Sequence, residues 1–227
     1  MNIIQTWKTK DIPIHLFNYI QKIRNLNPNC NYIFFDDNDI DKFMKLTTPE
    51  YYECFCNLTE KIQQIDFFRY VAIYYYGGLY LDLDIDIVTS FDDIDINKCI
   101  FPIELKHPSD EILIKNNLPS IGNYAFYAPK GHPFIKMVID NILNQRISDE
   151  IIEKASITHG DTPRDVRIYY TTGPILISQT YYDYVSINND DSVILLEPSP
   201  YIDNCFGKYG FHKFYGSWRL NTIPKQL

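Results

Sequence analysis

IYYYGGLYLDLDIDIV, residues 73–88, contains the end of one helix and the beginning of one strand. Upstream, apolar side chains recur at three- and four-residue steps over residues 60–76, which predicts a helix with one apolar stripe. The members of the stripe are Ile62, Ile65, Phe68, Ala72 and Tyr75. Gly77 and Gly78 then end the helix, because glycine lacks a β-carbon and readily leaves helical geometry. Residues 79–81 are apolar and begin a strand.

The N-terminal segment predicts an α/β fold. Residues 3–7 form a short apolar strand, and residues 32–35 form a second one. Between them a helix is expected, with Asp11 as its cap, Pro13 in its first turn and its end near residue 26. The helical spacing is carried by Ile14, Phe17, Ile20 (or Leu16) and Ile23. A strand–helix–strand opening is typical of α/β sheets.

The rest of the chain continues this alternation. Strands are expected at 99–103, 124–127 and 193–196, and helices at 132–145 and 172–184. The tail from residue 206 to 218 is rich in glycine and aromatic residues, so we expect a loop that folds back over a site. A length of 227 residues fits one mid-sized domain.

Composition excludes several classes of protein. The net charge is -8 and no Lys/Arg block exists, which argues against a nucleic-acid binder. The five cysteines are scattered and lack the paired spacing of a zinc site, so a reducing compartment is favoured. No signal peptide and no apolar run of the ~20 residues needed for a membrane span are found. The location is expected to be cytoplasmic, or is left open.

Three carboxylates follow the strand at alternate positions: Asp82, Asp84 and Asp86. Alternate residues of an extended strand share one face, where three anions repel one another unless a cation lies between them. Oxygen ligands of this kind suit Mg²⁺ or Mn²⁺. Asp86 is the least defined of the three, either orienting the other two or capping the turn at residues 89–90. The acidic run at 36–39 more simply caps the next helix.

Asp66 and Arg69 lie three positions apart, on one face of the expected helix. Alone, such a pair fits an ordinary surface ion pair. Because it precedes the Gly-Gly break and the acidic strand, the pair could instead reach the same site.

The segments QIDFFRY (64–70) and YGGLYLDLD (76–84) together resemble the central motif of glycosyltransferase family 32, the DXD sugar-binding transferases that include initiating α-1,6-mannosyltransferases. Further similar segments follow the family's order along the chain: IIQTWK (3–8), NYA (123–125), KGHPF (130–134), TGP (172–174) and HKFYGSW (212–218). Ile4 departs from the family pattern, which has His at that position.

The resemblance implies a GT-A fold: a Rossmann-like α/β domain whose mostly parallel central sheet is flanked by helices. A single domain would span 1–227, with a nucleotide-binding half at about 1–90 and an acceptor-side half at about 91–227. It implies retaining transfer of a hexose from a GDP- or UDP-sugar to a hydroxyl of a glycan, protein or lipid acceptor. It also implies Mn²⁺ or Mg²⁺ as cofactor.

The resemblance also implies residue roles. Asp84 would bind the metal and His212 would complete the metal or diphosphate site. Asp82 would contact the ribose and donor sugar, and with Asp84 and Asn123 it forms the expected catalytic set. The expected donor-binding residues are Trp7, Asp66, Arg69, Gly78, Tyr80, Asp82, Ser217 and Trp218.

Three other readings of the acidic strand remain. DIDIV (84–88) fits the short pattern of haloacid-dehalogenase-like phosphatases, with Asp84 as nucleophile. An EF-hand is weaker, since Ile87 stands where that loop needs glycine. The third is a catalytically inactive glycan-binding module.

Overall fold

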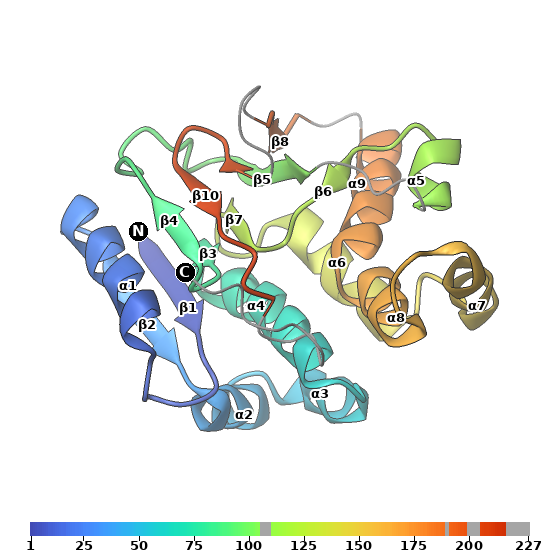
Figure 1. Cartoon of the computed structure of the whole chain (residues 1–227), viewed down its shortest axis with the longest axis horizontal. Coiled ribbons are helices and arrows are strands. Elements are labelled where there is room, and N and C mark those ends of the chain that lie inside the picture. The colour runs from blue at the N-terminus through green and yellow to red at the C-terminus, as the bar shows by residue number, and fades with distance from the viewer. Residues whose placement is uncertain (105–109, 189–190, 199–204, 217–227) are drawn as a thin grey trace.

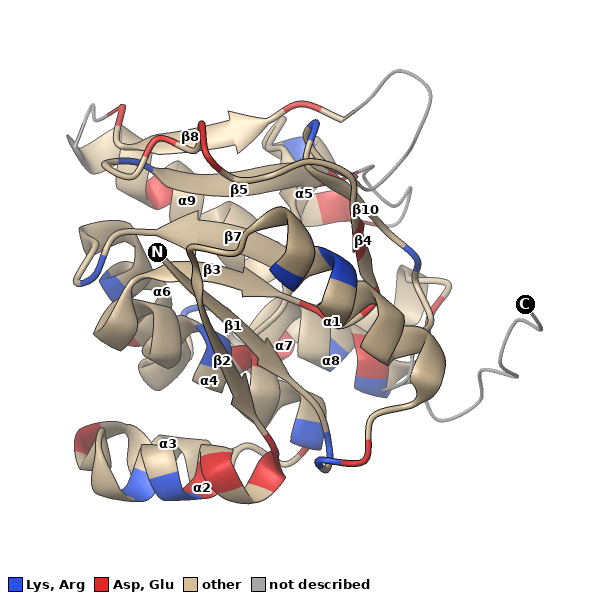
Figure 2. Ribbon diagram, turned by 90° about the vertical axis from the view of Figure 1, so that its left-hand side faces the viewer, with Lys and Arg blue, Asp and Glu red and all other residues tan. Residues whose placement is uncertain are grey.

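The computed structural model describes residues 1–104, 110–188, 191–198 and 205–216 of the chain. Within them, seven strands form one sheet in the order β2-β1-β3-β7-β5-β6, with β8 on β5 (Figures 1 and 2). Their bounds are β1 Asn2–Thr6, β2 Asn31–Phe35, β3 Gly78–Leu81, β5 Cys99–Glu104, β6 Ser120–Ile121, β7 Ala125–Ala128 and β8 Val193–Leu196. A smaller sheet, β4-β10-β9, comprises Ile85–Ile87, Gly210–His212 and Cys205–Phe206.

The large sheet is mixed, with most of its described strands pointing one way. β1 pairs in parallel with β2 and β3, and β8 pairs in parallel with β5. β7 runs antiparallel to both β3 and β5, and β6 runs antiparallel to β5. Thus β1, β2, β3, β5 and β8 share one direction and β6 and β7 take the other. The predicted α/β fold with a mostly parallel central sheet is confirmed; its division near residue 90 stays a prediction.

Helices cover both faces of this sheet (Figure 1). Their bounds are α1 Ile14–Leu26, α2 Asp37–Leu46, α3 Tyr52–Asn57, α4 Lys61–Tyr76, α5 Glu111–Lys115, α6 Pro133–Leu143, α7 Asp149–Thr158, α8 Pro163–Thr171 and α9 Pro174–Asn188, with a 3₁₀ turn at Pro49–Tyr51. Successive strand residues point to opposite faces. Accordingly Ile4 and Tyr80 join a core with α4, α6 and α9, whereas Ile3 and Leu79 join a core with α1 and the small sheet. No helix among the described residues has the length and apolar character needed to cross a membrane.

Helix α1 buries a different face from the predicted one. Leu16, Ile20 and Ile23 are buried, while Ile14 and Phe17 are 73% and 41% exposed. The helix begins after Pro13 without a side-chain cap, so the expected Asp11 cap is wrong. Hydrophobic spacing alone allowed two overlapping stripes, and contact with the sheet selected the second.

Helix α2 begins with a capping box, as the acidic run predicted. The Asp36 side chain accepts from the Asp39 amide at 2.8 Å, and the Asp39 side chain accepts from the Asp36 amide. Capping satisfies amide groups that have no partner inside the helix. The helix starts at Asp37, whereas the sequence predicts a start near Ile40.

Helix α4 is buried on all sides through its middle, not along one stripe. Residues 66–73 are all buried, whereas the predicted stripe member Tyr75 is 39% exposed. The helix contacts α3, α6 and α8 as well as β3 and β7. A helix surrounded in this way has little use for an amphipathic pattern. Its buried polar residues therefore need partners inside the protein.

Several elements of the second half were not expected from the sequence. Helices α5, α7 and α8 were not predicted. The tail is described to residue 216, and it contains the β9–β10 hairpin where a loop had been predicted. The fold-back itself is confirmed, since the Lys213 amide donates to the Asp84 carbonyl at 3.0 Å.

Glycine is required at the start of β3. Gly78 has φ of +120°, and a β-carbon there would lie 2.4 Å from the Asn2 carbonyl oxygen of β1. We expect Gly78→Ala to lower the free energy of unfolding by more than about 2 kcal/mol, because strain adds to a backbone clash. Gly131→Ala is the matched control: its φ is +73° but nothing lies within 4 Å of the added carbon. Urea denaturation of both variants measures the difference; equal losses would refute the role of the clash.

Candidate active site

The acidic segment forms a turn between two sheets, not a continuous strand. β3 ends at Leu81 and β4 begins at Ile85, and the Ile85 amide donates to the Asp82 carbonyl at 3.2 Å across the turn. The prediction that three carboxylates share one strand face is therefore wrong. The turn arises because β3 continues the large sheet whereas β4 pairs with β10.

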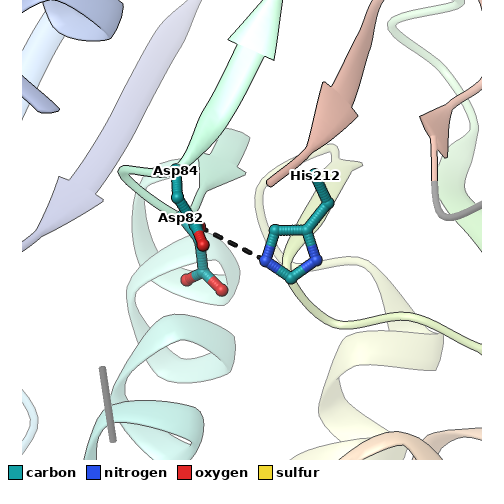
Figure 3. A group of neighbouring side chains, drawn as sticks. All are labelled: Asp82, Asp84 and His212. Carbon is teal, nitrogen blue, oxygen red and sulfur yellow. Dashed lines mark ion pairs between the residues drawn. The ribbon is translucent and has the colours of Figure 1, made fainter. Parts of the chain in front are cut away.

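Asp82, Asp84 and His212 form a cluster with metal-binding geometry. One ligand atom from each lies within 4.8 Å of the others, and the three side chains point toward one another (Figure 3). The His212 Nε2 atom lies 3.2 Å from Asp84 Oδ1. Two carboxylates and one imidazole suit Mn²⁺, and the oxygen ligands also suit Mg²⁺. The predicted metal residues Asp84 and His212 are thus brought together, and Asp82 joins them.

The C-terminal segment holds Asp84 in place. The Tyr215 amide donates to Asp84 Oδ2 at 3.0 Å. Burial would raise the pKa of Asp84, but hydrogen bonds from His212 and the Tyr215 amide outweigh burial and hold the pKa below its ordinary value. Asp84 therefore stays ionised and available to a cation.

His212 is held by aromatic packing. Its ring stacks on Tyr124 with centroids 4.4 Å apart and lies 4.0 Å from the Phe214 ring. Burial would lower the pKa of His212, but the Asp84 carboxylate outweighs burial and raises it. The Nδ1 atom is buried and has no hydrogen-bond partner among the described residues. The imidazole is thus oriented by stacking and by its contact with Asp84.

Arg69 bridges two acids below the cluster. Its Nη2 atom lies 3.1 Å from Asp66 Oδ1 and 3.6 Å from Asp82 Oδ1. Its Nη1 atom donates to the Asn123 carbonyl at 2.7 Å, and the guanidinium lies 4.5 Å from the centre of the Tyr80 ring. Because the Arg69 and Asp66 side chains are 3% and 4% exposed, the surface ion-pair interpretation is wrong. The helix pair does reach the acidic turn.

Asp66 is the centre of a buried hydrogen-bond network. It accepts from Thr172 Oγ1 at 2.9 Å and from Asn123 Nδ2 at 3.0 Å. Burial outweighs the attraction of Arg69 and raises the pKa of Asp66 to about 6. Asn123 Nδ2 also donates to the Tyr70 hydroxyl at 3.0 Å. Tyr70 and Thr172 were missed as site residues, although Thr172 opens the TGP segment that the resemblance had marked.

Asp82 is fixed by its neighbours on β1 and β3. The Tyr80 hydroxyl donates to Asp82 Oδ1 at 2.9 Å and lies 3.1 Å from Thr6 Oγ1. Gln5 Nε2 donates to the carbonyls of Leu81 and Asp82 at 3.2 and 3.3 Å. Burial, despite the opposing effect of Arg69, raises the pKa of Asp82. Gln5, which holds the backbone of the turn, was not expected from the sequence.

Other expected residues lie farther from the cluster. Trp7 packs against the small cluster of Leu16, Ile20 and Leu83, which includes a residue of the turn. Gly78 lies at the opposite end of β3 from Asp82. Ile4, which stands where the family pattern has His, is buried in the core on the α4 side of the sheet. Ser217 and Trp218 lie outside the described residues.

Asp86 is not part of the cluster. Its carboxylate lies 2.7 Å from Lys22 Nζ and 3.2 Å from Lys213 Nζ, so it links α1 to the C-terminal segment. Burial acts in the opposite direction, but the two lysines hold the pKa of Asp86 below its ordinary value. The expected orienting or capping roles are therefore replaced by an ion-pair role. Asp86 is also the second acid of the phosphatase pattern, and there too its carboxylate is paired with Lys22 and Lys213.

Residues 13–101 match the family model for the glycosyltransferase sugar-binding region containing a DXD motif. These residues include the buried Asp66–Arg69 pair and the turn with Asp82 and Asp84. Across this region the chain is similar to glycosyltransferases that contain a DXD motif, as the sequence resemblance predicted.

Two curated relatives are similar to this chain. The chain is similar to inositol phosphoceramide mannosyltransferase 3 of Schizosaccharomyces pombe, with 30% identity over 141 residues, covering 62% of this chain and 36% of that protein. It is also similar to mannosyl phosphorylinositol ceramide synthase CSH1 of Saccharomyces cerevisiae, with 28% identity over 202 residues, covering 88% and 47%. The chain spans about a third to a half of the length of these relatives.

Solved structures share the fold. The UDP-bound glycosyltransferase domain of the YGT toxin superposes with a TM-score of 0.60 at 8% identity, covering 94% of this chain and 83% of that one. The PaToxG glycosyltransferase superposes with a TM-score of 0.54 at 18% identity, covering 82% and 69%. At these identities the likeness establishes the α/β glycosyltransferase fold.

Proposed function

We propose that this chain is a metal-dependent glycosyltransferase that moves a hexose, mannose in the first instance, from a nucleoside diphosphate sugar to an acceptor hydroxyl. The observation that carries the proposal is the convergence of Asp82, Asp84 and His212 within 4.8 Å, beside the buried Asp66–Arg69 pair. Mannose as the sugar is supported by the names of the two yeast relatives.

The roles of the residues follow from their contacts. A divalent cation held by Asp82, Asp84 and His212 would neutralise the charge that develops on the departing diphosphate. Arg69 keeps one oxygen of Asp82 oriented, and Tyr80 donates to the same oxygen. The Asp66 network fixes Arg69 and Asn123 at the edge of the site, so these groups need little reorganisation when the donor binds. A position of Trp7 at the border of the nucleotide is part of the proposal, supported by its packing against the cluster that includes Leu83 of the turn.

The acceptor that we propose is a hydroxyl of a lipid-linked inositol phosphate. This choice rests on the names of the relatives, which refer to inositol phosphoceramide and mannosyl phosphorylinositol ceramide. Retention of configuration at the anomeric carbon is part of the proposal and follows from the resemblance to family 32.

The test is a matrix of donors and metals. Purified protein is incubated with GDP-mannose, UDP-glucose or UDP-galactose, with Mn²⁺ or EDTA, and with inositol phosphoceramide in detergent micelles. We expect Mn²⁺-dependent transfer from GDP-mannose and a product whose anomeric configuration by NMR equals that of the donor. Transfer from a UDP-sugar, without transfer from GDP-mannose, would show that the donor sugar is glucose or galactose and not mannose. Transfer unaffected by EDTA would refute the metal dependence. Absence of nucleotide binding together with capture of beryllofluoride would refute the transferase.

The pH dependence of metal binding is a further prediction. Protonated imidazole cannot bind a metal, so proton and cation compete for His212. Because Asp84 raises the pKa of His212 above its usual 6.5, the competition begins above that pH. We expect the affinity for Mn²⁺, measured by calorimetry, to fall as the pH decreases through neutrality, by at most about tenfold per pH unit for one proton.

His212→Gln separates this competition from general acid effects. The variant should bind Mn²⁺ more weakly at pH 8 and show a flatter dependence between pH 6 and 8. A slope equal to that of the unmodified protein would show that another group controls the competition.

A further inference from the structure

Glu104 lies on the same edge of the sheet as the acidic turn. β3 and β5 point in the same direction because both run antiparallel to β7. Asp82 follows the last residue of β3, and Glu104 is the last residue of β5. Figure 2 shows β3, β7 and β5 in succession. With strands about 4.8 Å apart, the backbones that carry the two acids are separated by roughly 10 Å across the sheet.

Glu104 also lies on the face of the sheet that carries His212. Strand side chains alternate, so Glu104 shares a face with Ile100, whose core includes residues of β4 and β9. Cys99 and Phe101 point into the other core. The small sheet with His212 covers the Glu104 face.

The Glu104 carboxylate lies over Gly122, next to Tyr124. A β-carbon on Gly122 would lie 2.7 Å from Glu104 Oε1 and 2.5 Å from Tyr124 Cε1. The Tyr124 ring stacks on His212, and the Tyr124 carbonyl accepts from the Asp82 amide at 2.7 Å. Thus Tyr124 lies between Glu104 and the cluster residues Asp82 and His212. The carboxylate of Glu104 occupies the space left by the missing side chain of Gly122.

The Glu104 carboxylate has no hydrogen-bond or ion-pair partner within residues 1–104, 110–188, 191–198 and 205–216, yet it is only partly exposed. Burial raises the pKa of Glu104 to about 7; His212 opposes that rise, and the carboxylates of Asp110 and Asp82 add to it. A partly buried acid without a partner is costly to maintain. The position therefore suits a group whose partner is the substrate.

We infer that Glu104 binds the attacking hydroxyl of the acceptor and takes its proton during transfer. This role rests on the proposed function. The acceptor oxygen approaches the face of the anomeric carbon from which the diphosphate leaves, so the configuration is retained. Its bond to that carbon forms as the bond between the carbon and the diphosphate oxygen breaks, and the electron pair of the broken bond leaves with the nucleoside diphosphate. The hydroxyl proton passes to the Glu104 carboxylate and is later released to water. A base near neutral pKa is suited to this step.

The experiment compares Glu104→Gln with Glu111→Gln, an exposed acid at the start of α5. Transfer from GDP-mannose to inositol phosphoceramide micelles is measured with Mn²⁺, alongside calorimetry of GDP with Mn²⁺. We expect Glu104→Gln to lower kcat for transfer about 100-fold or more. The Kd for GDP with Mn²⁺ should stay within about twofold, because the variant removes a proton acceptor and no donor contact. Glu111→Gln should behave like the unmodified protein.

Chemical rescue distinguishes a reacting carboxylate from a structural one. Glu104→Ala leaves space that sodium formate can enter, and added formate should restore part of the lost transfer. Transfer by Glu104→Gln at the unmodified rate would overturn the inference, as would a loss of GDP binding equal to the loss of transfer, or no rescue. If the unmodified protein shows no metal-dependent turnover, the proposed function itself fails and the role of Glu104 falls with it.

Discussion

Asp84→Asn is expected to abolish Mn²⁺ binding at the cluster and to reduce kcat/KM for transfer by roughly 1000-fold. Asparagine has nearly the same shape and can still accept the hydrogen bond from the Tyr215 amide. It lacks the negative charge, however, and Asp84 is the carboxylate in contact with His212. The loss is therefore electrostatic and leaves the fold intact. Calorimetry with Mn²⁺ and steady-state kinetics measure it.

Asp86→Asn is the matched control, because it makes the same chemical change two residues away. Its carboxylate pairs with Lys22 and Lys213 outside the cluster. We expect the affinity for Mn²⁺ to change little, whereas the free energy of unfolding falls by less than about 1 kcal/mol, as for exposed ion pairs. Equal loss of metal binding in both variants would show that overall negative charge, not the cluster, attracts the cation.

Arg69→Met is expected to lower the free energy of unfolding by about 3–5 kcal/mol, which is the cost of leaving a buried charge without its partner. The guanidinium is the cation in contact with both Asp66 and Asp82. Methionine fills much of the volume but supplies no charge. Urea denaturation at neutral pH, followed by circular dichroism, measures the change.

The double variant Asp66→Asn/Arg69→Met tests whether charge causes this loss. Removing both members of a buried pair leaves no uncompensated charge between them, so the double variant should be more stable than Arg69→Met alone. Simple addition of the two single-variant losses would show that Arg69 stabilises through packing and through its bond to the Asn123 carbonyl.

Local features of the fold were predictable from the sequence. The helix before Gly77 and the strand after Gly78 follow from apolar spacing and glycine geometry. The capping box at Asp36 also follows from local chemistry. These features depend on neighbours within a few positions, and such neighbours are visible in a linear pattern.

The candidate site was predictable in its residue types but not in its geometry. Alternate acids suggested one strand face, whereas pairing of β4 with β10 turns the chain and directs Asp86 to Lys22. The contact from Thr172 to Asp66 joins residues 106 positions apart. Glu104 carries no motif and is recognised only once β5 is placed two strands from β3. The positions of Asp86, Thr172 and Glu104 all depend on contacts between distant parts of the chain, and a local periodic pattern does not encode such contacts.

The pairing of β4 with β10 has a consequence for synthesis of the protein. The amide of Tyr215 reaches a side chain 131 positions earlier, and His212 arrives on the same late strand. A nascent polypeptide whose residue 212 is still inside the ribosome can pair β1, β2 and β3, yet it lacks the third ligand. Translation must therefore pass residue 212 before the three side chains of the proposed metal site can come together, so unfinished chains contain the DXD turn without His212.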